Sequence, residues 1–111
     1  MTSETDMVGI SIVAPALSAI VAEITNYARG YGGRFADWYV GIAADPRDRL
    51  FNGHRVKEQG DAWIYRRCQS CAEARAIEAH FLKSGMDGGP GGGDDTTRSV
   101  YAYRKTAATI E

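Results

Sequence analysis

The sequence predicts a small α/β domain of the α+β type, in which a sheet of about three to four strands is flanked by helices. Segments 37–42, 62–67 and 99–104 are rich in aromatic and β-branched residues, as strands are. Segment 15–28 and the segment after Ser70 repeat apolar residues every three or four positions, which is the pattern of a helix with one buried face. With 111 residues, the chain has room for one domain.

The N-terminal part contributes an extra helix to this fold. Residues 1–6 are polar, and we expect a disordered N-terminus there, ahead of a single domain over residues 7–111. Alternating apolar and small residues over 8–12 predict a short strand. Pro15 suits the first turn of a helix that runs to about Ala28. The apolar face of this helix is formed by Leu17, Ile20, Val21, Ile24 and Ala28.

Two capping patterns mark the starts of two further helices. Asp45 and Pro46 match an N-cap residue followed by a proline in the first turn, and the helix they begin extends to about residues 53–54. Ser70 and Glu73 form an S-x-x-E capping box, in which each side chain accepts a hydrogen bond from a free backbone N–H. The helix that follows buries Ala74, Ile77 and Phe81 on one face.

Glycine dominates segment 85–93, where it occupies six of nine positions. Such a segment forms neither helix nor strand, because glycine loses the most backbone freedom on ordering. The strand that follows, 99–104, alternates so that Val100 and Ala102 face one side and its two tyrosines face the other.

Composition narrows the classes of function. Hydrophobic residues make up 44% and charged residues 24%, as in a globular protein. No apolar run approaches the roughly 20 residues that span a bilayer, and the first residues are acidic, unlike a signal peptide. We therefore expect a cytoplasmic protein with no membrane partner. The net charge of -1 requires any DNA or RNA to bind through a local patch.

Three residues, read in order, resemble the GIY-YIG nuclease family. Tyr39 stands in Tyr-Val-Gly, which is similar to the second half of the motif that names the family. Arg49 follows ten residues later, on the helix that the family places directly after this motif. Glu78 lies on the next helix, after small and apolar residues similar to those before the family's metal-binding glutamate. The resemblance covers about residues 38–105.

This resemblance implies a metal-dependent hydrolase of nucleic-acid phosphodiesters. In the family a single divalent metal, Mg²⁺ or Mn²⁺, sits on the glutamate, a tyrosine helps to activate the attacking water, and the arginine steadies the scissile phosphate. The implied catalytic residues are Tyr39, Arg49 and Glu78, with Glu78 also the metal ligand. A hard cation keeps several waters, so one carboxylate and a substrate phosphate suffice to hold it.

Three parts of the family's pattern are absent from this sequence. No Gly-Ile-Tyr stands shortly before Tyr39, so the first tyrosine is missing or displaced. The histidine or tyrosine one helical turn after Arg49 would fall at Gly53, and His54 comes one residue late. No asparagine follows Glu78. The hypothesis therefore has two forms, an active nuclease and a catalytically inactive relative that binds nucleic acid.

Basic residues on and after the second helix offer a local patch for such binding. Nearby strand tyrosines would allow bases to stack beside the charged backbone. The predicted nucleic-acid-binding residues are Arg47, His54, Arg55, Lys57 and Arg66.

Two alternatives belong to other classes of function. The first is a small interaction module that forms a homodimer through the N-terminal amphipathic helix. The second is a dithiol redox protein, because Cys68 and Cys71 form a C-x-x-C at a helix start, where thiol pKa values fall. Two buried, inert cysteines are the competing interpretation of that motif.

Overall fold

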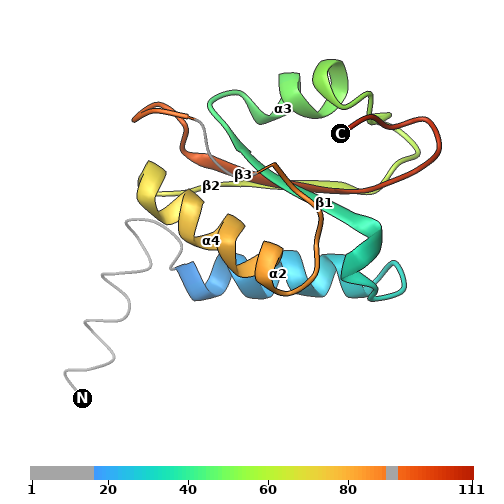
Figure 1. The fold of residues 1–111 in the computed structure, drawn as a ribbon, viewed down its shortest axis with the longest axis horizontal. Helices are drawn as coiled ribbons and strands as arrows, with labels where there is room; N and C mark the ends of the chain where they lie inside the picture. The colour runs from blue at the N-terminus through green and yellow to red at the C-terminus, as the bar shows by residue number, and fades with distance from the viewer. Residues whose placement is uncertain (1–16, 90–92) are drawn as a thin grey trace.

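The structure is a computed structural model that describes residues 17–89 and 93–111. Its centre is a three-stranded antiparallel sheet (Figure 1). The strands are β1 (Trp38–Ala43), β2 (Trp63–Arg67) and β3 (Ser99–Arg104). Their order is β1-β3-β2, so the last strand in the chain is the central one. The predicted α+β class is confirmed, whereas the strand predicted over 8–12 lies outside the described residues.

Two layers cover the sheet (Figure 1). Helices α2 (Leu17–Arg29) and α4 (Cys71–Lys83) lie on one face. The short helix α3 (Pro46–Asp48), the π-helical turn η2 (Arg49–Gly53) that continues it, and the segment 105–111 lie on the other. A single 3-10 turn, Phe35–Asp37, leads into β1.

The alternation of side chains divides the interior into two cores. Val40, Val100 and Ala102 point towards α2 and α4 and are fully buried there. Tyr101 and Tyr103 point to the opposite face, as the alternation predicted. Their partners on that face are Ala43, Leu50, Val56 and, less deeply buried, Tyr39, Phe51, Trp63 and Tyr65.

The capping predictions hold at both helix starts. Asp45 accepts a hydrogen bond from the backbone N–H of Asp48 at 3.1 Å, and Ser70 accepts one from Glu73 at 3.1 Å. The Glu73 carboxylate accepts in turn from the N–H of Gln69 at 2.9 Å, one residue before the expected partner. The helix predicted to run to about residues 53–54 is confirmed in its bounds, although only three residues are α-helical before the chain widens into the π-helical turn η2, which ends at Gly53.

The apolar face of α2 packs on the protein's own core. Ile20, Ile24 and Ala28 have no exposed surface, and Leu17 at the start of the described helix is 38% exposed. This face is thus not an uncovered stripe of the kind that would favour a homodimer. Among the described residues, no helix combines the length and apolar character needed to cross a membrane.

The glycine-rich segment also contributes to the sheet edge. Asp87 forms a parallel bridge with Tyr39, in which Val40 donates to the Asp87 carbonyl at 2.8 Å and Asp87 donates to the Trp38 carbonyl at 2.9 Å. The described part of this segment forms no helix or strand, as predicted, and Asp87 makes only this isolated bridge. The bridge holds the segment beside Tyr39.

Candidate active site

The candidate site centres on Tyr101 of β3, on the sheet face opposite α2 and α4. Tyr101 lies directly across from Gly41 in the antiparallel register. A Cβ added at Gly41 would meet Tyr101 Cζ and Oη at 2.5 Å. The tyrosine ring therefore lies in space that any side chain at residue 41 would fill, and the glycine of Tyr-Val-Gly is needed for this close approach.

His54 joins Tyr101 to segment 105–111 through its two ring nitrogens. Nε2 lies 2.7 Å from Tyr101 Oη, and Nδ1 lies 2.7 Å from the carbonyl oxygen of Ile110. A carbonyl oxygen only accepts, so Nδ1 carries a proton; in the neutral ring Nε2 is then bare and accepts from the Tyr101 hydroxyl.

The environment of His54 favours this neutral ring. The residue is 6% exposed. Burial lowers the pKa of His54, and the positive charge of Arg49 lowers it further. The hydrogen bond to Ile110 and the negative charge of Glu111 act in the opposite direction. At neutral pH the imidazole is uncharged, with a basic nitrogen directed at the phenol.

The π-helical turn explains how His54 reaches this position. The His54 N–H donates to the carbonyl of Arg49, five residues earlier, at 2.8 Å. A five-residue hydrogen bond of this kind defines a π turn and is common at functional sites. The wider turn absorbs the one extra residue, so His54 completes the turn that Arg49 begins.

The residues predicted as catalytic all affect the pKa of the Tyr101 phenol. Burial is the largest factor raising the pKa of Tyr101, to about 12, and Tyr39 and Glu78 raise it as well. The positive charge of Arg49 opposes them and lowers the pKa of Tyr101. Tyr39 and Arg49 belong to elements on the Tyr101 side of the site, whereas Glu78 belongs to α4, which covers the opposite face of the sheet, and influences Tyr101 through its charge alone.

Tyr39 forms one wall of the site. Its ring stacks on Tyr103 with centroids 5.3 Å apart and lies 4.7 Å from the imidazole of His54. An alanine-sized side chain at Gly89 would come within 3.5 Å of its hydroxyl oxygen. Tyr39 therefore lies between the aromatic cluster and the glycine-rich segment.

Glu78 is a buried acid rather than a surface residue. It is 5% exposed on α4, next to the core residue Ile77. Burial raises the pKa of its carboxyl group, and the positive charge of Arg75 opposes the shift. A desolvated carboxylate suits a hard cation, which would supply the missing positive charge. Within residues 17–89 and 93–111 no three His, Cys, Asp or Glu residues cluster as a metal site, so the remaining ligands would be water and substrate oxygens.

A cavity of about 400 Å³ opens beside Arg49. It lies at the end of β1, where the chain turns into α3, and its other wall is formed by Gly93, the last residue of the glycine-rich segment, and by Thr97. Its size accommodates a nucleotide-sized group. The lining residues are Ile42, Ala43, Ala44, Asp45, Asp48, Arg49, Gly93 and Thr97.

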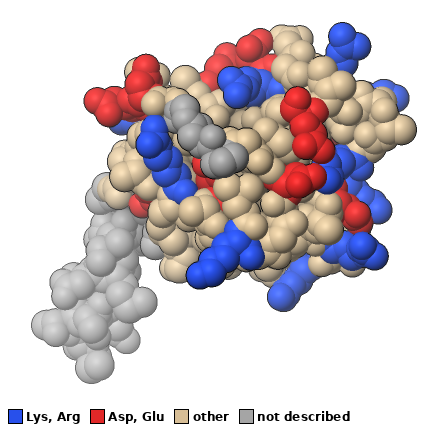
Figure 2. Space-filling model, in the orientation of Figure 1, with Lys and Arg blue, Asp and Glu red and all other residues tan. Residues whose placement is uncertain are grey.

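The five residues predicted to bind nucleic acid do not form one patch. His54 is buried in the site, and Arg66 points to the other face of the sheet, where it pairs with Glu23 of α2 at 2.6 Å. Arg47 pairs with Glu58 and covers aromatic rings on its own face. Arg55 and Lys57 are exposed. In the view of Figure 2, basic and acidic side chains alternate across the described surface.

The two cysteines lack the features of a redox pair. Both are free; Cys68 is buried and Cys71 is partly exposed. Burial raises the pKa of Cys68 to about 11, with the charge of Glu73 adding to the effect. A thiol that resists ionisation is a poor nucleophile, so the competing interpretation of inert cysteines fits the structure better.

Comparison of the chain with family models, with curated proteins and with solved structures found no match. The description of the candidate site therefore depends on its geometry alone. Sequence reasoning missed Tyr101 because the resemblance calls for a tyrosine before Tyr39, whereas Tyr101 enters the site from β3, near the end of the chain. The available signal was the pair of tyrosines on one face of segment 99–104.

Proposed function

We propose that the protein is a cytoplasmic, metal-dependent hydrolase of nucleic-acid phosphodiesters that resembles the GIY-YIG nucleases. The observation that carries this proposal is the hydrogen bond from Tyr101 to His54, at a phenol that Arg49, Tyr39 and Glu78 also influence. Tyr101 takes the part of the tyrosine missing from the sequence before Tyr39.

Tyr101 acts as a proton relay in this proposal. Its pKa of about 12 keeps the phenol protonated at neutral pH, so it does not serve as a ready phenolate. Instead, the attacking water gives a proton to Tyr101 Oη while the phenol passes its own proton to His54 Nε2. The hydroxide adds to phosphorus, the bond to the leaving oxygen breaks, and solvent protonates that oxygen. The Ile110 carbonyl stabilises the imidazolium formed.

Arg49 and Glu78 serve the phosphate in this scheme. Arg49 lines the cavity, where its planar fork can bind a phosphate whose charge grows in the transition state. Glu78 would hold the divalent ion. A bound Mg²⁺ or Mn²⁺ supplies positive charge that polarises the scissile phosphate.

The test is incubation with plasmid DNA and with structured RNA in the presence of Mg²⁺ or Mn²⁺. Tyr101→Phe removes only the relaying hydroxyl, and we expect about 10²- to 10⁴-fold slower cleavage. Tyr65→Phe is its matched control, because Tyr65 lies directly across from Tyr101 in β2 on the same face. Glu78→Gln should abolish metal-dependent cleavage. Cleavage by no protein, or equal cleavage by all, contradicts the proposal.

Binding without cleavage would support the inactive form of the hypothesis. Fluorescence anisotropy with labelled DNA and RNA separates the two forms, since Arg49→Ala should weaken binding and Arg67→Ala, an exposed arginine of β2, should not. Because basic and acidic groups alternate on the surface, we expect weak affinity that falls further with salt.

A further inference from the structure

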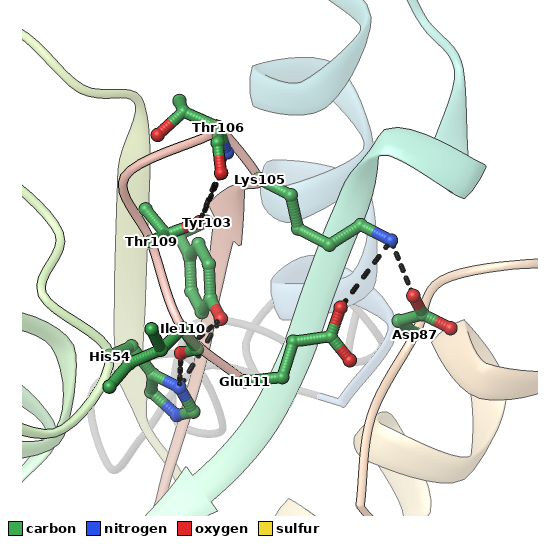
Figure 3. Close-up of polar contacts among 8 residues, drawn as sticks. All are labelled: His54, Asp87, Tyr103, Lys105, Thr106, Thr109, Ile110 and Glu111. Carbon is green, nitrogen blue, oxygen red and sulfur yellow. Dashed lines mark hydrogen bonds and ion pairs between the residues drawn. The ribbon is translucent and has the colours of Figure 1, made fainter.

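Segment 105–111 leaves the end of β3, turns back and reaches His54 (Figure 3). The Ile110 N–H donates to the carbonyl of His54 at 2.9 Å, while its own carbonyl accepts from Nδ1 of the ring at 2.7 Å. Tyr103 donates its hydroxyl to the same Ile110 carbonyl at 3.2 Å. The segment therefore contacts His54 through backbone groups at two points.

The turn within the segment is held by two threonines. The Thr106 N–H donates to Thr109 Oγ1 at 3.0 Å, and Thr109 Oγ1 donates to the Thr106 carbonyl at 3.1 Å. Lys105 forms ion pairs with Asp87 of the glycine-rich segment and, at 3.9 Å, with Glu111 (Figure 3). The segment is thus fixed at its start, at its turn and near its end.

Apolar burial does not explain why the segment returns to this place. The Ile110 residue is 48% exposed and stands among the large hydrophobic residues left on the surface. Its carbonyl, by contrast, accepts two hydrogen bonds from the site. The contacts that hold the segment are polar, and two of them bring Ile110 to His54, one at its backbone carbonyl and one at Nδ1 of its ring.

We propose that segment 105–111 is a positioning strap that fixes the tautomer of His54, with the proton on Nδ1, so that Nε2 remains the proton acceptor for Tyr101. The inference rests on the proposed function, because it gives the relay its direction. Without an acceptor at Nδ1, the neutral ring could instead carry its proton on Nε2 and donate to Tyr101, and the phenol would have no base.

The groups around the ring show what else acts on it. Tyr39 of β1 and Tyr101 and Tyr103 of β3 contact the imidazole with their rings. The positive charge of Arg49 in η2 disfavours the protonated ring, and the negative charge of Glu111 in the strap favours it. The Tyr103 hydroxyl lies 3.2 Å from Nδ1, yet it donates to Ile110. The Ile110 carbonyl is thus the strongest acceptor that faces Nδ1.

The test is ¹⁵N NMR of the His54 ring, whose nitrogen shifts distinguish a protonated from a bare ring nitrogen. The double variant Thr106→Val with Thr109→Val removes the side-chain bonds of the turn and leaves every residue that touches His54 unchanged. We expect the wild type to carry its proton on Nδ1 alone and the double variant to show a mixture of tautomers, with kcat lowered about tenfold or more at constant KM. Thr25→Val, on α2 and on the other face of the sheet, is the control.

The outcomes separate this inference from the proposed function. A wild-type proton pattern in this double variant and also in Lys105→Met overturns the strap, whatever the cleavage rate. A mixture of tautomers supports the strap even when no substrate is cleaved, and in that case only the hydrolase proposal fails. Lys105→Met, which removes both ion pairs and keeps the turn, provides a milder variant; a mixture of tautomers there again supports the strap, and a wild-type pattern in both variants overturns it.

Discussion

Replacing Gly41 by alanine tests whether the close approach of Tyr101 to β1 matters. The new Cβ would lie 2.5 Å from Cζ and Oη of Tyr101, whereas ordinary contact begins at 3.4 Å, so the ring must move by about 0.9 Å. The bond from Tyr101 to His54 Nε2 is 2.7 Å long, and a shift of this size is enough to break it.

Two effects of Gly41→Ala follow from this displacement. Overpacking costs about 1–3 kcal/mol and reduced backbone freedom of the unfolded chain returns about 0.5–1 kcal/mol, so we expect a net loss of up to about 2.5 kcal/mol. A misplacement of about 1 Å at a catalytic group lowers the rate about 10²-fold. Urea unfolding measures the first effect and cleavage of plasmid DNA with Mg²⁺ the second.

Gly53→Ala is the control for this substitution. Its Cβ would meet Arg49 Cδ at 3.6 Å, which is ordinary contact, at a residue close to the same site. We expect cleavage near that of the wild type and a free energy of unfolding raised by up to about 1 kcal/mol, because alanine reduces the backbone freedom of the unfolded chain here without a clash. The reasoning is refuted when Gly41→Ala unfolds and cleaves like Gly53→Ala.

Four further outcomes are expected. Burial raises the pKa of the Glu78 carboxyl, so the ionised carboxylate destabilises the fold above that pKa. Glu78→Gln should therefore raise the free energy of unfolding by about 0.5–2 kcal/mol at neutral pH. This gain should disappear in acid, and denaturation measured over a range of pH would record it. The pKa of His54 is lowered from 6.5, so kcat should rise with pH around a pKa below 6.5 and then level off. For the same reason the free energy of unfolding should fall as the pH drops below 6.5. A pH–rate profile in which kcat still rises above pH 6.5 contradicts the relay. In the native protein, iodoacetamide should modify Cys71 and leave Cys68 unmodified. With a pKa of about 11, only about one thousandth of Cys68 is thiolate at pH 8. Equal labelling of the two cysteines by mass spectrometry would support the dithiol alternative. Ser70→Ala should cost about 0.5–2 kcal/mol in thermal unfolding, because the Glu73 N–H loses its acceptor, while cleavage stays unchanged.

The sequence by itself determined the local structure and part of the site. Two helix caps, at Asp45 and Ser70, and the alternation of 99–104 depend on neighbours within a few residues. The sequence alone therefore predicts them. The resemblance singled out Arg49 and Glu78 from order and spacing alone. The burial of Glu78 did not follow from the sequence, because burial depends on which face α4 turns to the sheet.

Only the tertiary structure decided how the site is completed. Tyr101 lies sixty residues after Gly41, and no periodicity in the sequence predicts that the last strand pairs with the first. The π turn that places His54 and the strap that meets its ring have no local signature either. Hydrogen bonds between distant segments form only when packing has set the order of the strands, and here that order brings Tyr101, near the end of the chain, to His54.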